Sequence, residues 1–141
     1  MRQGIRIALA TVLMLLAVSA VAASRSQRRS LEDVQAAYAA AVRWNDFDTA
    51  QEIIDPQYRK EHPTSDLERA RYEQVQISGY RELRAGNGAN DNEVVRDVEL
   101  RVINRNTQAE RTVRVHETWR WDPQAKQWWL ASGLPDLWRG E

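Results

Sequence analysis

The residue of this chain best suited to chemistry is a glutamate inside an apolar strand pattern. Alternation along residues 110–121 places Glu117 on the face that also carries Val113, Val115, Trp119 and Trp121. A carboxyl group on an apolar face has a raised pKa, so Glu117 could act as a general acid or base. The alternative is a structural ion pair with an arginine such as Arg81 or Arg101. Because arginine is abundant in the chain, we expect the ion pair.

Aromatic side chains are the other candidates for a site. The hydroxyl groups of Tyr80 and Tyr72 could donate a hydrogen bond to a ligand carbonyl, although half-buried tyrosines are common in strands. Tryptophans on two adjacent strands could stack on a flat ligand, but core packing is the role we expect for most of them. The candidate ligand contacts are Tyr80, Trp119, Trp121 and Trp128. Trp128 and its neighbour Trp129 face opposite sides, so one of them should lie outside the core or under the C-terminal tail.

The chain lacks the residues that several other kinds of site require. It contains no cysteine, which excludes disulfides, thiol chemistry and cysteine-based metal sites. Its two histidines are His62, expected in a loop, and His116, expected at the surface, so we expect no metal and no cofactor. No nucleophile elbow, phosphate loop or dinucleotide fingerprint is present in the sequence. Most classes of enzyme therefore have no support.

The first 23 residues have the layout of a secretory signal peptide. Arg2 and Arg6 precede an apolar run over residues 7–23 that ends in small residues around Ala22. We therefore predict cleavage after residue 22 and a periplasmic or secreted protein. The alternative is an uncleaved segment, residues 7–23, that anchors the protein in the inner membrane. The run is slightly short for a spanning helix, whereas the basic residues that follow it oppose export.

Length and charge limit the class of the mature protein. We expect a signal peptide at residues 1–22, a polar basic spacer at 23–30 and a single α+β domain at 31–141. The expected signal peptide contains two of the 20 basic residues, so the mature protein would have 18 basic and 20 acidic residues. This balance gives no electrostatic case for nucleic-acid binding. Contact with a membrane is expected only if the leader is retained.

Apolar spacing predicts two to three helices in the first half of the domain. A helix over residues 31–43 follows Ser30 as its N-cap, and a second helix covers residues 48–54. The pair Asp55-Pro56 is expected to end the second helix, and residues 57–64 are expected to form a loop. A capping box between Ser65 and Glu68 predicts a short third helix near residues 66–70.

The second half of the domain has the pattern of an antiparallel sheet. Strands are expected over residues 72–83, 93–104, 110–121 and 127–132, with a bulge at Ser78-Gly79. Helices followed by strands indicate an α+β fold with the helices packed on a curved four-stranded antiparallel sheet. The strand arginines Arg96, Arg101, Arg114 and Arg120 are expected on the solvent face, in a ladder with acidic residues.

This order of elements resembles a known architecture, the nuclear transport factor 2-like superfamily, also called the cystatin-like cone. The resemblance covers nearly all of residues 31–132. It is carried by Tyr38-Ala39-Ala40-Ala41-Val42, Asn45-Asp46-Phe47, Tyr72-Glu73-Gln74-Val75, Thr118-Trp119-Arg120-Trp121 and Gln127-Trp128-Trp129-Leu130. It implies an exported bacterial member in which the face of Glu117 lines the cone. Members of the superfamily include isomerases, dehydratases, cyclases, transport adaptors and periplasmic secretion subunits, so the resemblance does not choose a function.

Two hypotheses from different classes follow. The first is a non-enzymatic binding or assembly module of the cell envelope, whose partner is a small hydrophobic ligand or an envelope protein, with a homodimer through the sheet as a further possibility. The second is a small isomerase or hydrolase that acts on a hydrophobic substrate with Glu117 as acid or base. An open cavity around an unpaired Glu117 favours the enzyme, and a cone filled by tryptophans favours the binding module.

Overall fold

A computed structural model describes residues 24–138, which belong to two units divided after Asp33. In the first unit, residues 24–33 are helical throughout. The helix expected to begin after Ser30 therefore starts earlier and includes the expected spacer, because residues 24–29 contain neither glycine nor proline. The predicted signal peptide lies outside the described residues. Among the helices described within residues 24–138, none combines the length and the apolar composition needed to cross a membrane.

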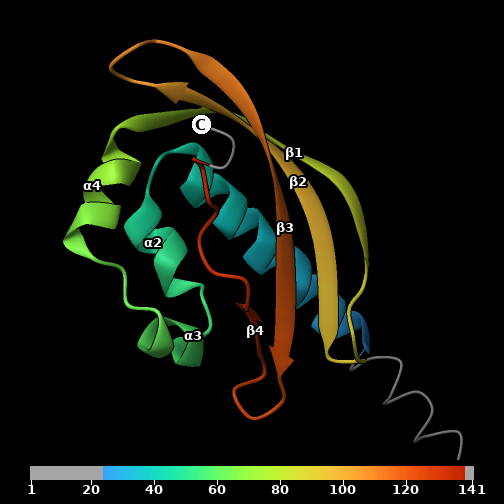
Figure 1. Ribbon diagram of the computed structural model, residues 1–141. Coiled ribbons are helices and arrows are strands. Elements are labelled where there is room, and N and C mark those ends of the chain that lie inside the picture. Colours follow the sequence, from blue (N-terminus) through green and yellow to red (C-terminus); the bar gives the residue numbers. More distant parts are fainter. Residues whose placement is uncertain (1–23, 139–141) are drawn as a thin grey trace, which may run out of the picture. The chain divides into compact units, whose positions relative to one another are not determined.

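The second unit contains a four-stranded antiparallel sheet with its strands in chain order. The strands are β1 (Val75–Asn87), β2 (Glu93–Asn104), β3 (Glu110–Asp122) and β4 (Gln127–Leu130). Helical residues 34–43 precede α2 (Phe47–Glu52), α3 (Pro56–Glu61) and α4 (Asp66–Glu73). Figure 1 shows the helices on one side of the curved sheet. The prediction of an α+β fold with N-terminal helices packed on a curved antiparallel sheet is confirmed.

The starts of two helices show where the sequence pattern was and was not sufficient. The capping box at α4 is present, since Ser65 and Glu68 each accept a backbone hydrogen bond from the other. The expected loop at residues 57–64 is wrong, because α3 occupies most of it. The pair Asp55-Pro56 ends no helix. Instead, the Asp55 side chain accepts from the Gln57 amide as an N-cap, and Pro56 fills the first helical position, where its missing N–H costs nothing.

The first strand begins later than its sequence suggested. Tyr72 belongs to α4, and β1 starts at Val75. Asn45 fixes this start, because its side chain donates to the Val75 carbonyl at 2.6 Å and accepts from the Ile77 amide at 3.0 Å. The predicted bulge is confirmed by a register shift between Ile77 and Gly79. A second shift, between Glu82 and Arg84, was not predicted.

The core of the second unit lies between the sheet and the helices. Trp119 is completely buried there, and its ring meets the edge of Tyr38 with centroids 5.6 Å apart. Trp128 is also buried, and Trp129 is half-buried. Trp121, which was placed on the same face as Trp119, is only half-buried. It lies near the end of β3 and packs on Trp128 with ring centroids 5.5 Å apart.

The opposite face of the sheet carries the expected ladder of charges only in part, since Arg120 pairs instead with Asp55, the N-cap of α3, at 2.7 Å. His116 lies 2.6 Å from Asp97, and Arg114 lies 3.8 Å from Glu99. Arg96 does not join them, because it is only 6% exposed and faces the core. It has the same strand parity as Val98, so alternation along β2 turns both side chains inward. The predicted solvent position of Arg96 is therefore wrong.

Candidate functional site

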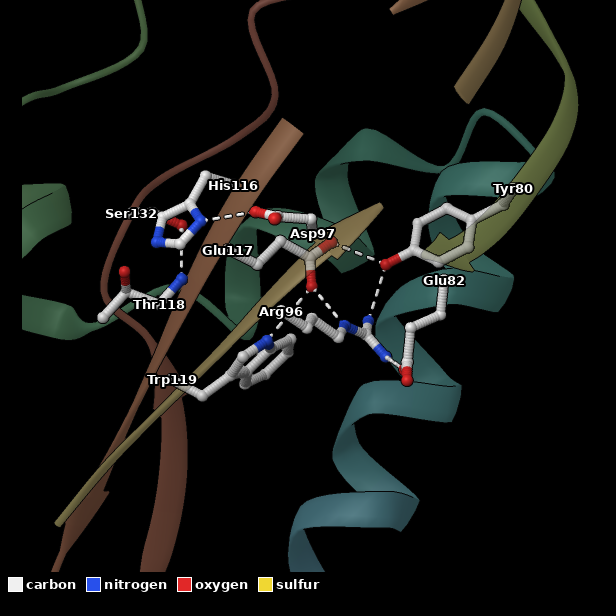
Figure 2. A network of polar contacts seen from close by, with 9 residues as sticks. All are labelled: Tyr80, Glu82, Arg96, Asp97, His116, Glu117, Thr118, Trp119 and Ser132. Atoms are coloured by element: carbon white, nitrogen blue, oxygen red, sulfur yellow. Dashed lines mark hydrogen bonds and ion pairs between the residues drawn. The ribbon is translucent and has the colours of Figure 1, made fainter. Parts of the chain in front are cut away.

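Glu117 lies inside the second unit, as its strand parity predicted. It is 2% exposed, and three donors surround its carboxylate (Figure 2). The Tyr80 hydroxyl donates to Oε1 at 2.6 Å, and Arg96 Nε donates to Oε2 at 2.6 Å. The indole Nε1 of Trp119 donates to Oε2 at 3.1 Å. Every partner is a donor, which is the pattern that an ionised carboxylate requires.

Strand register and a bulge bring this cluster together. Arg96 and Glu117 are direct cross-strand partners in the β2–β3 pair. In β1, Val75 and Ile77 face the core before the bulge, and the extra residue at the bulge then switches the parity. Tyr80 consequently points inward and reaches Glu117. Without the bulge, Tyr80 would face solvent.

Arg96 and Tyr80 both keep their protons in this cluster, because the pKa of each group is raised. Burial disfavours the charge of Arg96, but Glu117 and Tyr80 beside it more than compensate, so the pKa of Arg96 is raised. Burial, together with the neighbouring Glu117, raises the pKa of Tyr80, which therefore keeps its proton. The Tyr80 hydroxyl also accepts from Arg96 Nη2 at 2.6 Å. Each of these polar side chains therefore has a hydrogen-bond partner within the cluster.

This geometry agrees with a structural role for Glu117 and identifies a partner that the sequence did not. Arg81, one of the two partners considered, pairs instead with Glu99 on the solvent face at 2.7 Å. Glu82 gives Arg96 a second, weaker partner at 3.6 Å. Glu117 is 2% exposed, so a substrate could reach its carboxylate only if the side chains around it moved. The expectation that Glu117 pairs with an arginine is confirmed, with Arg96 in that position.

The remaining sequence candidates are not gathered around one space. Trp119 belongs to the Glu117 cluster, whereas Trp121 and Trp128 pack on each other. His116 is exposed, and His62 stacks on Tyr58 with ring centroids 4.3 Å apart. Within residues 24–138, no group of histidine and acidic side chains is arranged to hold a metal ion.

A cleft that the sequence did not reveal lies among the helices of the second unit. One part of about 220 Å³ is lined mainly by α2 and α4, and an adjoining part of about 330 Å³ is lined mainly by α3 and α4. We call the two parts together the helix-side cleft. They share the lining residues Gln51, Thr64, Tyr72 and Leu134. The larger part lies at the lower end of the volume range of small-molecule sites, and the smaller part lies below it.

The C-terminal residues close one side of the helix-side cleft. The Tyr72 hydroxyl donates to the Pro135 carbonyl at 2.8 Å, and the Tyr72 ring packs 4.5 Å from that of Phe47. Gly133 has a φ of 74°, and a Cβ atom at this position would lie 2.6 Å from the Tyr58 ring. Only glycine therefore lets the chain pass over Tyr58. Sequence reasoning missed this cleft because it placed Tyr72 in a strand and α3 in a loop.

Comparisons with known proteins support the fold alone. No protein-family model matches the chain, and no curated protein matches it. The fold is similar to the solution structure of a SEC-C motif containing protein from Rhodopseudomonas palustris, with a TM-score of 0.53 and 21% sequence identity. The similarity covers 67% of this chain and 70% of that chain. At this identity the likeness carries no functional inference.

Proposed function

We propose that this chain is a non-enzymatic binding module of the cell envelope that takes a small ligand. The observation that carries the proposal is the state of Glu117, which three donors enclose within the core. A carboxylate in this arrangement stabilises a fold rather than exchanging protons with a substrate. The resemblance to the nuclear transport factor 2-like superfamily, which has binding as well as catalytic members, is compatible with the proposal. The signal-like N-terminus supports a periplasmic location.

The helix-side cleft is the place where we expect the ligand to bind. It combines the aromatic rings of Phe47, Tyr58 and Tyr72 with many polar and charged side chains that could orient a ligand. The free edge of the sheet is less suited to a protein partner. Two irregularities interrupt β1, and exposed charges such as Arg81 and Arg84 follow along it, features that discourage pairing with another strand.

One fractionation experiment tests location and binding together. The chain is expressed in its own cells, the periplasmic and membrane fractions are separated, and the intact mass and the bound small molecules are measured in each. We expect periplasmic protein that begins near Ala23 and carries a small molecule. The variant Thr64→Trp, which fills the shared part of the cleft, should lose that molecule. The matched variant Thr112→Trp, on the exposed face of β3, should keep it.

The outcomes separate the parts of the proposal. Full-length chain found only in the membrane fraction would overturn export and favour an anchor at residues 7–23. If Thr64→Trp and Thr112→Trp carry the same bound small molecule, the helix-side cleft is not the binding site. Turnover of the extracted molecule by the wild type, abolished in Glu117→Gln with the fold intact, would favour the isomerase or hydrolase.

A further inference from the structure

We propose that the helix-side cleft recognises a small monocarboxylate with an apolar body, and that Arg59 is the residue that binds the carboxylate. This inference rests on the proposed function and adds the class of its ligand. Arg59 belongs to α3, is half-buried and lines the larger part of the cleft.

The hydrogen-bonding state of Arg59 is the first line of support. Its Nε–H is buried and has no partner in the described part of the chain, and its guanidinium makes no ion pair there. A buried donor of a charged group without a partner is costly, so a ligand that supplies an acceptor gains affinity from it. A carboxylate matches the guanidinium best, because it can accept two parallel N–H bonds.

The other charged groups of the cleft leave Arg59 as its available cation. Three arginines line the cleft within the described residues. Arg69 lies 3.6 Å from Asp48, and Arg105 Nε donates to the Val75 carbonyl at 3.1 Å. Both already have a partner, whereas the side chain of Arg59 has none in the described residues.

The acidic residue in the lining of this part of the cleft, Glu68, is not the partner of Arg59. Glu68 lines the same part of the cleft, but its Oε2 accepts from the amide of Ser65 at 2.8 Å and from its hydroxyl at 2.9 Å. These hydrogen bonds lower the pKa of Glu68 and keep its charge at the start of α4. The ligand carboxylate is therefore expected at the α3 end, away from Ser65.

Part of the remaining lining fits an apolar body. Beside the polar Gln51 and Thr64 it includes aliphatic and aromatic side chains, with the Tyr58 ring held by its stacking on His62. These side chains are Ile54, Tyr58, Pro63, Tyr72 and Leu134. A chain or ring attached to the carboxylate can lie against them while the carboxylate faces Arg59. A more highly charged ligand would place charge against this apolar wall, at a cost in desolvation.

Three probes of nearly equal size and different charge test the inference. They are 3-phenylpropionate, 3-phenylpropanamide and 3-phenylpropylamine, titrated into the purified protein and followed by amide chemical shifts. We expect 3-phenylpropionate to bind with a dissociation constant of about 1 mM, as for other fragment-sized ligands. The shifts should lie around Ile54, Tyr58 and Leu134. The amide should bind at least roughly tenfold more weakly, because it lacks the charge-assisted pair with Arg59.

Two arginine variants show whether Arg59 causes the difference in affinity between the acid and the amide. Arg59→Gln should weaken 3-phenylpropionate at least roughly tenfold and leave the amide unchanged. The control Arg114→Gln, on the solvent face of β3, should change neither. Equal binding of acid and amide, or unchanged binding in Arg59→Gln, would overturn the assignment. If only the amine binds the cleft, the ligand class is wrong while the binding function survives. If none of the probes binds the cleft, the carboxylate class is wrong, and the cleft's part in the proposed function rests on the Thr64→Trp result.

Discussion

The substitution Glu117→Gln examines the feature on which the interpretation of this protein depends. Glutamine has the shape of glutamate but offers one acceptor oxygen and an NH₂ donor. If its oxygen stays with Arg96 and Trp119, its NH₂ group faces the Tyr80 hydroxyl. That hydroxyl already accepts from Arg96, so its own proton would lose its acceptor. The variant therefore removes the charge that compensates Arg96 and disturbs a second hydrogen bond.

The size of the effect follows from burial. Arg96 is 6% exposed, and its remaining carboxylate partner, Glu82, lies at 3.6 Å with half of its side chain in solvent. Removing one member of a buried ion pair costs about 3–5 kcal/mol, because the other charge stays buried. The variant Tyr80→Phe keeps the ion pair but removes two hydrogen bonds to charged groups, one to Glu117 and one from Arg96, and should cost at least about 1.5–3 kcal/mol. Domains of this kind have a total stability of about 5–15 kcal/mol, so the first loss is a large share.

Urea unfolding followed by circular dichroism and tryptophan fluorescence measures these losses. The control Glu110→Gln changes an exposed glutamate of the same strand and should stay within about 0.5 kcal/mol of the wild type. The double variant Arg96→Met/Glu117→Leu should recover part of the loss, since the apolar pair needs no compensation, whereas the Tyr80 hydroxyl and the Trp119 indole lose their acceptor. A loss below about 1 kcal/mol in Glu117→Gln would refute the reasoning, because it falls well outside the cost of breaking a buried pair.

Two further outcomes are expected from unfolding experiments. Trp119→Ala should cost about 3–5 kcal/mol, whereas Trp44→Ala, at a side chain that is 85% exposed, should stay within about 0.5 kcal/mol; equal losses would contradict the packing of β3. The free energy of unfolding should also fall as the pH drops through the acidic range. Hydrogen bonds from His116 and Arg84 lower the pKa of Asp97 in the folded state, so its contribution is present above the ordinary aspartate range and is lost as protons bind. Asp97→Asn should make the fall shallower, and an unchanged acid profile would contradict this assignment.

The fold could be predicted from the sequence because alternation and capping are local signals. The β2 and β3 patterns and the capping box at Ser65 each depend on residues a few positions apart. The failures have an equally local cause. Asp55-Pro56 is compatible with the end of one helix and with the start of another, and the residues that follow did not decide between them.

The candidate site was predictable only in part, for a different reason. The inward direction of Glu117 follows from parity, and parity also turns Arg96 inward, but its charge favoured the solvent face. Tyr80 joined them through the bulge, whose effect on the facing residues depends on its position in the ladder. The helix-side cleft depends on contacts between distant segments, such as the 2.8 Å hydrogen bond from Tyr72 to Pro135. No local pattern encodes such contacts.

The buried ion pair has a further consequence for the register of the long strands. A slip of one residue between β2 and β3 would turn apolar side chains outward, but a slip of two would keep them inside. The direct pairing of Arg96 with Glu117 opposes the slip of two, because it would place each charge opposite an apolar residue such as Val98 or Val115. We therefore expect the ion pair to select the strand register, although it adds little stability compared with an apolar pair of similar volume. The double variant Arg96→Met/Glu117→Leu should therefore remain folded and yet show more than one set of β2 and β3 amide signals. A single set would mean that hydrophobic packing alone selects the register.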